Sequence, residues 1–495
     1  MSKSRPTISP ATRRPACPIL ALSLATLITL PGCAATTSRY ALVEDSLRVG
    51  NVTRADQIVE QAERDYGTTG RVLYRMDRGM TLHLAGRYQE SNTALDLAEQ
   101  EVEDLYTRRV RTETKAFLVN DTLLPYEGEP YEQVMLNVLK ALNYAGMGQL
   151  TDALVEARKI DHRLNVLSDQ VRDNKDAYRD DAFARYLTGI LYEATGDLNN
   201  AFIAYRNAYD GYRQARPWAR VTVPPTLQTD LLRVTEALHL TQEHQEYRQA
   251  FPDSTWQPAS QQQDLAQIVV IGYNGVAPRK EDQFIDLPIS LNALQLVLLA
   301  KGAIGPSNQD TRVMESLLYG LNGRVVRVAL PRLVPQKTHV AYEHIQLAGT
   351  AGRGQAFTGR TELAQDFTAL AAKSLNDRYT QIAVKAVARA AVKYALAEGA
   401  GQGARAAAGK DAGPLAGILV RALAHALAVG TEEADKRSWR TLPDEIQIAR
   451  LWVPPGSYEL RVHSVNRNGP PERDAVHAVT LKRGDTKFMI ERVVE

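Results

Sequence analysis

The feature that most constrains the fold is a glycine-centred pattern that recurs three times in the first half of the chain. Small residues let two antiparallel helices approach closely, a glycine permits the turn between them, and aromatic rings fill the seam. The best copy surrounds Gly196 with Gly189, Tyr192, Ala201, Tyr205 and Ala208. Partial copies surround Gly86, with Gly79, Leu82, Tyr88 and Ala98, and Gly148, with Ala141, Tyr144 and Ala153. The pattern predicts paired helices.

This spacing resembles the tetratricopeptide (TPR) repeat, a helix-turn-helix unit whose stacked copies build a concave surface that usually binds peptides or proteins. From about Ser46 to Ala250 the chain is rich in Leu, Ala, Glu, Gln and Arg with apolar residues at helical spacing, which favours helices in series. The three turn glycines are 62 and 48 residues apart, so insertions must separate the units. We expect one of them, Asp121 to Tyr131, to be an ordered loop. The alternative is a helical bundle without repeats.

The first 32 residues have the order of an export signal. A basic start without acidic residues precedes an apolar run from Ile19 to Leu30. The run has twelve residues, whereas a helix needs about 20 to cross a bilayer. The basic residues are Lys3, Arg5, Arg13 and Arg14.

The next segment, Leu30-Pro31-Gly32-Cys33, resembles a bacterial lipobox, with Pro31 in place of the usual small residue. The resemblance implies cleavage after Gly32, a diacylglycerol on the Cys33 thiol and an acylated (palmitate-type) new N-terminus. Alanine rather than aspartate at position 34 implies passage to the outer membrane of a Gram-negative cell. The alternative is an ordinary secretory peptide cleaved near Ala34 or Ala35.

Cysteine content and charge agree with a lipid anchor. The two cysteines are Cys17, inside the leader, and Cys33 at its end, so the exported chain would keep one cysteine, blocked by lipid. The net charge of +2 becomes −2 once the four leader cations are removed. That balance offers no basic excess for nucleic acid, and we expect no nucleic-acid partner.

The second half has a different composition. Residues 251–264 are polar and hold two prolines, which predicts a linker. Beyond it, IVVIGYNG and GRVVRVALPRLV are rich in β-branched residues and predict strands.

The C-terminal end is the clearest β region. Apolar and charged residues alternate from Tyr458 to Val462, after a Pro454-Pro455-Gly456 turn. The runs 476–482 and 487–494 flank the turn 483–486, which is consistent with a hairpin. This order is similar to small β-sandwich modules of the transthyretin-like and PEGA kind, which adhere or space rather than catalyse.

Residues 361–429 predict two apolar, alanine-rich helices separated by the glycine-rich segment 399–414. Lys385, Arg389 and Lys393 form a basic stripe, which favours a solvated face over a lipid or glycan-phosphate contact. Residues 415–429 are too few to span a membrane and contain Arg421 and His425, so we expect a buried helix there.

The segments that resemble motifs for catalysis or metal binding depart from those motifs in spacing or in residue type. Segment 403–411 has phosphate-loop glycines one residue too far apart and an acidic Asp411. His239 and His244 are five apart, not the four that would bind zinc on one helix face. Arg483-Gly484-Asp485 is best interpreted as a turn. The adjacent acids Asp180-Asp181 and Glu432-Glu433 most often face solvent.

The sequence as a whole resembles a family of uncharacterised bacterial lipoproteins, through MLNVLKALNYAGMGQLTDALVEARK, VVIGYNGVAPRK and DKRSWRTLPDEIQIARLWVPPGSYELRV. We expect an α+β protein with a leader (1–32), a lipidated tether (33–45), a TPR-like all-α solenoid (46–250), a linker (251–264), and a mixed domain (265–495) with antiparallel strands and an alanine-rich helical insertion.

The predicted function is that of an outer-membrane-anchored periplasmic adaptor. Its repeats would bind a protein or peptide partner in envelope assembly, cell-wall synthesis or export. We expect no enzyme activity, catalytic residue, cofactor or metal. The alternative is an envelope hydrolase or glycan-modifying enzyme with its site in the C-terminal domain, which a cleft with convergent carboxylates would favour.

Overall fold

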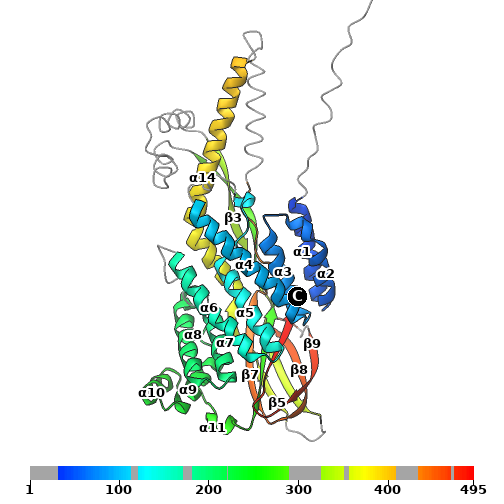
Figure 1. Cartoon of the computed structure of the whole chain (residues 1–495), viewed down its shortest axis with the longest axis vertical. Helices are drawn as coiled ribbons and strands as arrows, with labels where there is room; N and C mark the ends of the chain where they lie inside the picture. Colours follow the sequence, from blue (N-terminus) through cyan, green and yellow to red (C-terminus); the bar gives the residue numbers. More distant parts are fainter. Residues whose placement is uncertain are drawn as a thin grey trace, which may run out of the picture.

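The computed structural model describes residues 32–112, 121–170, 181–219, 221–288, 325–350, 356–407, 433–469 and 473–495. Helices fill the first half of the chain, and strands with one long helix fill the second (Figure 1). The helices are α1 (Gly32–Arg48), α2 (Val52–Gln61), α3 (Arg71–Leu84), α4 (Tyr88–Thr112), α5 (Pro130–Gly146), α6 (Leu150–Gln170), α7 (Ala182–Ala194), α8 (Leu198–Ala219), α9 (Pro225–Ala237), α10 (Thr241–Ala250), α11 (Ala259–Gln262) and α14 (Phe367–Ala407), with the short 3-10 helices η1 (Glu63–Tyr66) and η3 (Asp121–Leu123).

The strands form three sheets. The inner sheet has the order β10-β1-β7-β6, the outer sheet has the order β5-β4-β8-β9, and β2 pairs with β3 alone. Their bounds are β1 (Ala266–Asn274), β2 (Arg279–Pro288), β3 (Val325–Val334), β4 (Val340–Gly349), β5 (Phe357–Arg360), β6 (Glu362–Asp366), β7 (Glu445–Val453), β8 (Gly456–Asn466), β9 (Asp474–Leu481) and β10 (Thr486–Val493).

The helices from α1 to α10 form consecutive hairpins that share one turn geometry. At the turn after α3, the N–H of Gly86 donates to the carbonyl of His83 and the N–H of Arg87 to that of Leu82. This pair of bonds is the Schellman motif, which needs a residue of positive φ. The same two bonds recur at every such turn, whose positive-φ residues are Gly50, Gly86, Gly148, Gly196 and His239.

The turns predicted at Gly86, Gly148 and Gly196 are therefore confirmed, and the helical region is TPR-like. Gly50 and His239 add a hairpin at each end of the series, α1–α2 and α9–α10, which the sequence pattern did not indicate. The predicted insertion before α5 is also present: η3 and the loop after it lie between α4 and α5.

Close helix approach explains the small residues of the pattern. A Cβ added to Gly189 would lie 2.3 Å from the Tyr205 ring, and one added to Gly79 would lie 2.4 Å from a Leu95 methyl group. Neither glycine has a positive φ. Both are required by helix packing, because only a residue without a side chain lets α3 and α7 come this near to their hairpin partners.

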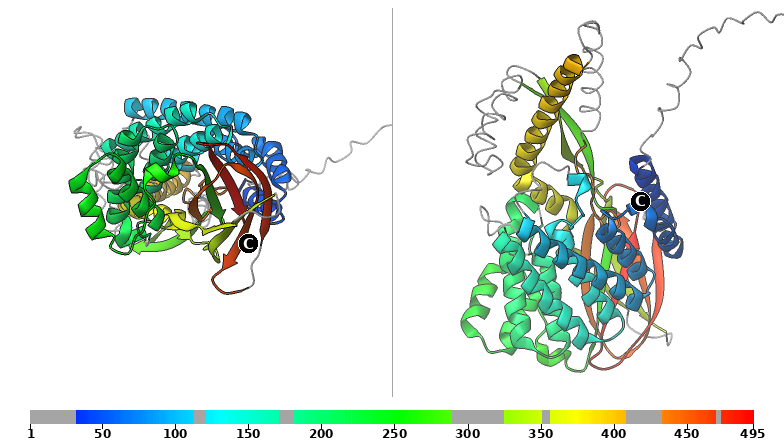
Figure 2. Two further views of the ribbon diagram at one scale, coloured as in Figure 1. Left: turned by 90° about the horizontal axis from the view of Figure 1, so that it is seen from below. Right: turned by 45° about the horizontal axis from the view of Figure 1, so that its top comes forward.

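The helices, the inner sheet and the outer sheet make successive layers. Strand β1 is buried along its whole length. Its Val269, Ile271 and Tyr273 belong to the core shared with the helices, whereas Ile268 and Val270 belong to the core shared with the outer sheet. Burial on both faces accounts for the continuous apolar sequence of β1. Seen from below, the helices curve around one side of the sheets (Figure 2).

The predicted C-terminal hairpin is wrong. Strand β9 pairs with β8 in the outer sheet, whereas β10 pairs with β1 in the inner sheet and runs parallel to it. The chain turns at Gly484, which has a φ of +75°, but it crosses from one sheet to the other instead of folding back on β9. Strand β1 needs a partner on each edge, and β10 supplies one. The predicted mixed domain is thus not purely antiparallel.

The predicted helical segment 361–429 also needs correction at its start and in its middle. Residues 362–366 form strand β6, and α14 then runs unbroken to Ala407, through part of the glycine-rich segment expected to separate two helices. Alanine has the highest helix propensity, and it offsets the cost of the interspersed glycines. Residues 408–432 lie outside the described part of the chain.

Helix α14 and the β2–β3 pair project together from the body, and we call them the arm (Figure 1). With 41 residues and a rise of about 1.5 Å per residue, α14 is about 60 Å long. In Figure 1 and in the right-hand view of Figure 2, the start of α1 faces the same end of the molecule as the arm. Within the described ranges, no helix is long and apolar enough to cross a membrane.

Several predictions concern residues that are not described. The leader, the side chains of Cys33, Arg389 and Lys393, and the predicted helix 415–429 are among them. Residues 33–45, for which a tether is predicted, lie in α1, where Tyr40 and Val43 are buried. The division into two domains and the likeness to PEGA modules stay predictions. One hydrophobic core is nevertheless continuous from the helices to the inner sheet.

Candidate functional site

The candidate site is the inner face of the helical repeats, formed by the first helix of each hairpin. Residues 433–444, which we call the inserted segment, run along this face without regular secondary structure. Three consecutive residues of the segment bind the first helices of the first three hairpins, although not in the order of those helices. Arg440 contacts Glu44 of α1 at 2.8 Å, the Thr441 hydroxyl donates to Asp77 of α3, and the Trp439 N–H donates to Glu132 of α5.

Asp77 is the centre of the contact with α3. Its carboxylate accepts hydrogen bonds from the hydroxyls of Tyr40, Tyr66 and Thr441 at 2.6, 2.7 and 2.8 Å. The side chain is fully buried, and burial raises the pKa of Asp77 despite these donors. The Arg39 guanidinium stacks 3.9 Å above the Tyr66 ring and partly offsets the carboxylate charge.

Glu132 is the centre of the contact with α5. Its carboxylate accepts bonds from the Tyr126 hydroxyl, the Glu129 N–H and the Trp439 N–H at 2.5, 2.9 and 2.8 Å. The bond to Glu129 closes a capping box at the start of α5. Burial raises the pKa of Glu132 to about 7, although Lys280 and the hydrogen bonds oppose the rise. Trp439 itself is 1% exposed, the largest of the fully buried side chains.

Arg437 fixes the beginning of the inserted segment. Its guanidinium donates to the main-chain carbonyls of Thr69, Leu124 and Asp121 and pairs with Asp435 at 2.7 Å. Buried main-chain carbonyls need hydrogen-bond partners, and a single arginine here donates to three of them. The contacts bind the loops before α3 and α5 to the C-terminal half.

The inner sheet completes the filling of the face beside α7 and α9. Arg450 of β7 is buried and pairs with Glu193 and Asp230, and Arg233 pairs with the same two acids. Although burial opposes it, the charges of Asp230 and Glu193 raise the pKa of Arg450. The two arginines lower the pKa of Glu193 to about 2. The cluster has two positive and two negative charges, so it is neutral as a unit.

Further hydrogen bonds join the repeats to strand β6 beside this cluster. The amide of Gln365 donates to Asp181, which also caps α7 through the Ala184 N–H at 3.0 Å. The Tyr212 hydroxyl donates to the carbonyl of Ala364 at 2.8 Å. The concave surface predicted to capture a partner is therefore occupied, over α1, α3, α5, α7 and α9, by the chain's own C-terminal half.

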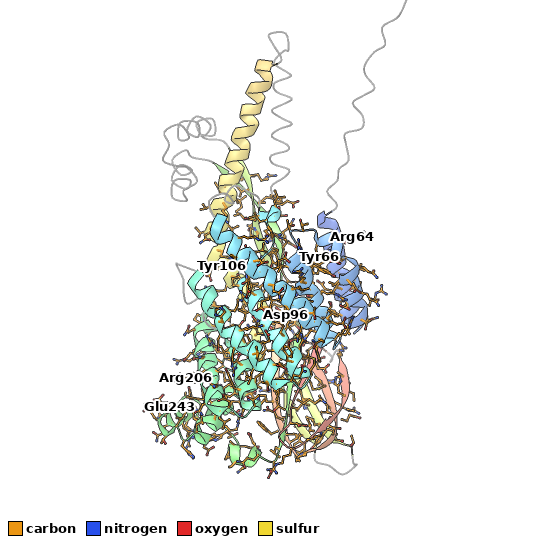
Figure 3. All side chains as sticks on the ribbon, in the orientation of Figure 1. Arg64, Tyr66, Asp96, Tyr106, Arg206 and Glu243 are labelled. Atoms are coloured by element: carbon orange, nitrogen blue, oxygen red, sulfur yellow. The ribbon has the colours of Figure 1, made fainter. Side chains whose placement is uncertain are left out.

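The outer faces of the repeats are not covered in this way. Exposed aliphatic side chains lie on the second helices of three neighbouring hairpins: Leu97 on α4, Val155 on α6 and Ile203 on α8 are 42%, 46% and 46% exposed. Polar residues such as Asp96 and Arg206 lie on the same helices (Figure 3).

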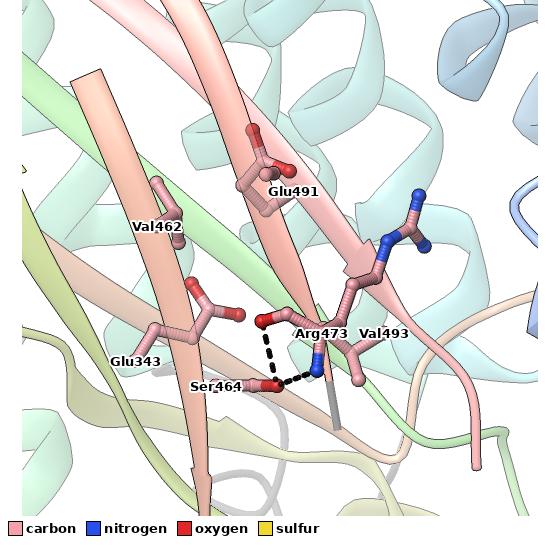
Figure 4. Close-up of a pocket in the computed structure, with 7 residues that line it drawn as sticks. Glu343, Val462, Ser464, Arg473, Glu491 and Val493 are labelled. Carbon is pink, nitrogen blue, oxygen red and sulfur yellow. Dashed lines mark hydrogen bonds between the residues drawn. The ribbon is translucent and has the colours of Figure 1, made fainter. Parts of the chain in front are cut away.

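The two histidines considered as metal ligands, His239 and His244, lie in different surroundings. His239 occupies the α9–α10 turn, whereas His244 contacts Thr235 and the carbonyl of Leu232. Among the described residues, no group of three histidine, cysteine or acidic side chains is placed to hold a metal ion. A cavity of about 10 Å³ lies between the inner and outer sheets (Figure 4). It has room for about one water molecule and not for a sugar ring.

The sequence analysis missed the residues that fill the inner face. A signal was present in the sequence: Glu44, Asp77, Glu132 and Asp230 interrupt the apolar stripes of predicted helices, where a charge requires a buried partner. The partners could not be named, because they lie 220 to 396 positions away for Asp230 and Glu44.

Comparison with known proteins adds little. No family model and no curated protein matches the chain. A Podospora anserina protein described as a kinesin light chain with TPR-like repeats is similar at 15% identity and a TM-score of 0.29, over 45% of this chain and 98% of that one. The Rap conjugation gene regulator of plasmid pLS20, solved with the Phr* peptide, is similar at 14% identity and a TM-score of 0.27, over 60% and 66%. These scores are low, so the TPR-like assignment rests on the hairpins themselves.

Proposed function

We propose that the protein is a lipid-anchored scaffold of the bacterial envelope whose outer helical face binds a protein partner. A lipid on Cys33 would hold it on the outer membrane, facing the periplasm. The partner would belong to envelope assembly, cell-wall synthesis or export, and the scaffold would bring it to the membrane without catalysing a reaction. Tethering raises the effective concentration of two bound components without any new contact.

The observation that carries the proposal is the filled inner face of the repeats. A groove occupied by a 1%-exposed tryptophan and by paired buried charges offers no entry to a peptide. The surface left to a partner is the outer one, and its exposed aliphatic residues recur on α4, α6 and α8. Exposed aliphatic side chains on the second helices of neighbouring hairpins give a protein partner apolar contacts.

The position of α1 supports the anchor. This helix begins at Gly32, beside the lipobox cysteine, and packs into the body through Tyr40, Val43 and Leu47. A lipid on Cys33 would therefore hold the folded body close to the bilayer. The arm, which extends toward the same end of the molecule, would then be directed to the membrane side.

Site-specific photo-crosslinking in cells tests the binding face. A crosslinking residue at position 97, 155 or 203 should capture a protein partner of one size. The matched control is Val476 on the outer sheet, which is also exposed (53%) but lies away from the repeats. A crosslinked product at position 476, with no product at positions 97, 155 and 203, would contradict the proposal.

Fractionation tests the anchor. The Cys33→Ser variant should lose acyl labelling and move from the membrane fraction to the soluble envelope fraction, while the Cys17→Ser variant should behave as the wild type because residue 17 lies in the predicted leader. Unchanged membrane association of the Cys33→Ser protein would show that another feature holds it there.

A further inference from the structure

Two neighbouring hairpins of the repeats carry the same pair of exposed side chains on their second helices. The residue seven positions after the turn glycine is aliphatic: Val155 in α6 and Ile203 in α8. The residue ten positions after it is an arginine: Arg158 in α6 and Arg206 in α8. Residues three apart lie on the same side of a helix, and all four side chains are exposed. Each of the two helices therefore presents an aliphatic group beside a guanidinium group.

The pair is confined to these two hairpins. At the equivalent positions, the second helices of the other hairpins, α2, α4 and α10, have neither an arginine nor a lysine: the residues are Gln57, Glu60, Thr93, Asp96, Glu246 and Gln249. Three of these six residues are acidic. The positive charge at this level of the repeats thus belongs to α6 and α8 alone.

Aromatic rings hold both arginines in place. The guanidinium carbon of Arg158 lies 5.9 Å from the centre of the Tyr192 ring, and its Nε donates to the Tyr192 hydroxyl at 3.3 Å. The guanidinium carbon of Arg206 lies 5.5 Å from the centre of the Phe202 ring. Stacking of this kind restricts a long side chain and keeps its charge at a defined place on the surface.

The carboxylates near these arginines do not pair with them. Asp197 lies close enough to feel the charge of Arg158, but it accepts hydrogen bonds from the N–H and the side-chain amide of Asn200 instead. Asp210 lies one turn beyond Arg206 on α8 and is exposed. In the part of the chain that the structure describes, neither arginine forms an ion pair with an acid. An oriented arginine without an acidic partner can bind an external carboxylate with little loss of side-chain freedom.

We propose that α6 and α8 bind an acidic peptide segment of the protein partner. Its aliphatic side chains would pack on Val155 and Ile203, and its carboxylates would pair with Arg158 and Arg206. The inference rests on the proposed function, because it names the chemistry of the partner that the outer face binds. Carboxylates match the two parallel N–H groups of a guanidinium, and an apolar contact beside each charge suits a peptide with both kinds of side chain.

The place of the surface favours a peptide over an anionic lipid. In Figure 3, Arg206 lies toward the end of the body that is opposite the arm. The proposed membrane would be on the arm side, so lipid headgroups of that membrane would not reach α8. A segment of another protein could approach from the periplasm.

Fluorescence anisotropy with defined peptides tests this chemistry. The purified full-length protein is titrated against a labelled peptide in which leucine alternates with glutamate, and against one in which glutamine replaces each glutamate. We expect the acidic peptide to bind at least tenfold more tightly, and the Arg158→Gln/Arg206→Gln variant to lose at least tenfold of that affinity. The control variant, Arg327→Gln/Arg461→Gln, removes two charges from exposed ion pairs of the arm and of β8. It should bind as the wild type does.

A second variant tests the apolar half of the surface. Val155→Ser/Ile203→Ser should also weaken the acidic peptide at least tenfold, and circular dichroism would establish that each variant is folded. Equal affinity for the acidic and the uncharged peptide, or no binding of either, would overturn the inference. So would binding of the Cys33→Ser protein to phosphatidylglycerol vesicles that the arginine variant loses, since an anionic lipid would then be the ligand.

Photo-crosslinking in cells separates a failure of this inference from a failure of the proposed function. With the crosslinking residue at position 97 on α4, the product should disappear when Arg158 and Arg206 are both replaced by glutamine. A product that persists in the arginine variant would overturn the acidic ligand and leave the outer face as the binding surface. The absence of a product at positions 97, 155 and 203 of the otherwise unaltered chain would instead contradict the proposed function.

Discussion

The main-chain N–H of Trp439 donates a 2.8 Å hydrogen bond to the carboxylate of Glu132, a residue 307 positions earlier in the chain. This bond joins the inserted segment to the first helix of a repeat, in the place where a TPR-like groove would accept a peptide. The tryptophan beside it is buried to 1%. The C-terminal half is therefore part of the repeat architecture and not an appendage of it.

Replacement of Trp439 by alanine should lower the free energy of unfolding by about 3–5 kcal/mol, because it leaves a large cavity between the inserted segment and the helices. Trp439→Phe should cost less. Urea unfolding followed by circular dichroism measures the change. The control is Trp256→Phe, whose ring is only partly buried against His244. A Trp439→Ala protein within 1 kcal/mol of wild type would show that the segment is loosely held.

Stability should fall as the pH rises through the titration of Glu132. Its pKa in the folded protein is about 7 against 4.5 in the unfolded chain, so the folded state prefers the neutral acid. The contribution is complete below pH 4.5, declines between pH 4.5 and 7, and amounts to about 3 kcal/mol. Urea unfolding at a series of pH values should give a shallower dependence for Glu132→Gln. Parallel curves for the two proteins would contradict the assignment.

Removing Arg450 should destabilise the protein more than any exposed arginine does. Arg450→Ala leaves Glu193 and Asp230 buried with one cation instead of two, and breaking a buried ion cluster costs about 3–5 kcal/mol. The control Arg461→Ala removes an exposed pair on β8 and should change stability by less than about 1 kcal/mol. Chemical denaturation distinguishes them. Similar losses for both variants would mean that the cluster is solvated.

Gly79→Ala should destabilise the protein although alanine favours helix by about 1 kcal/mol. The added methyl group would lie 2.4 Å from Leu95, and overpacking of this kind costs about 1–3 kcal/mol. The double variant with Leu95→Ala should be more stable than the sum of the two single changes, because the smaller partner makes room. Strict additivity in this double-mutant cycle would show that the two helices can separate without cost.

Local patterns predicted much of the fold correctly. Three hairpin turns, strands β1 and β3, and the C-terminal strand residues were recognised because glycine turns and apolar periodicity act over a few residues. Strands β2, β4, β5, β6 and β7 were missed. The charged sequence of β2 is stabilised by pairing with β3, which in turn packs against α14, and neither contact has a local signature.

The sequence by itself determined the hairpins that turn at Gly86, Gly148 and Gly196, since each of these Schellman turns depends on one glycine of positive φ and on residues close to it in the sequence. It also determined that the residues of β1 form a strand, because β-branched side chains dominate that segment. Only the tertiary structure decided that β9 and β10 enter different sheets, that Arg450 meets Asp230, and that residues 433–444 fill the inner face of the repeats. A local pattern encodes which face of an element is buried; the partner of that face is selected by packing between segments hundreds of residues apart.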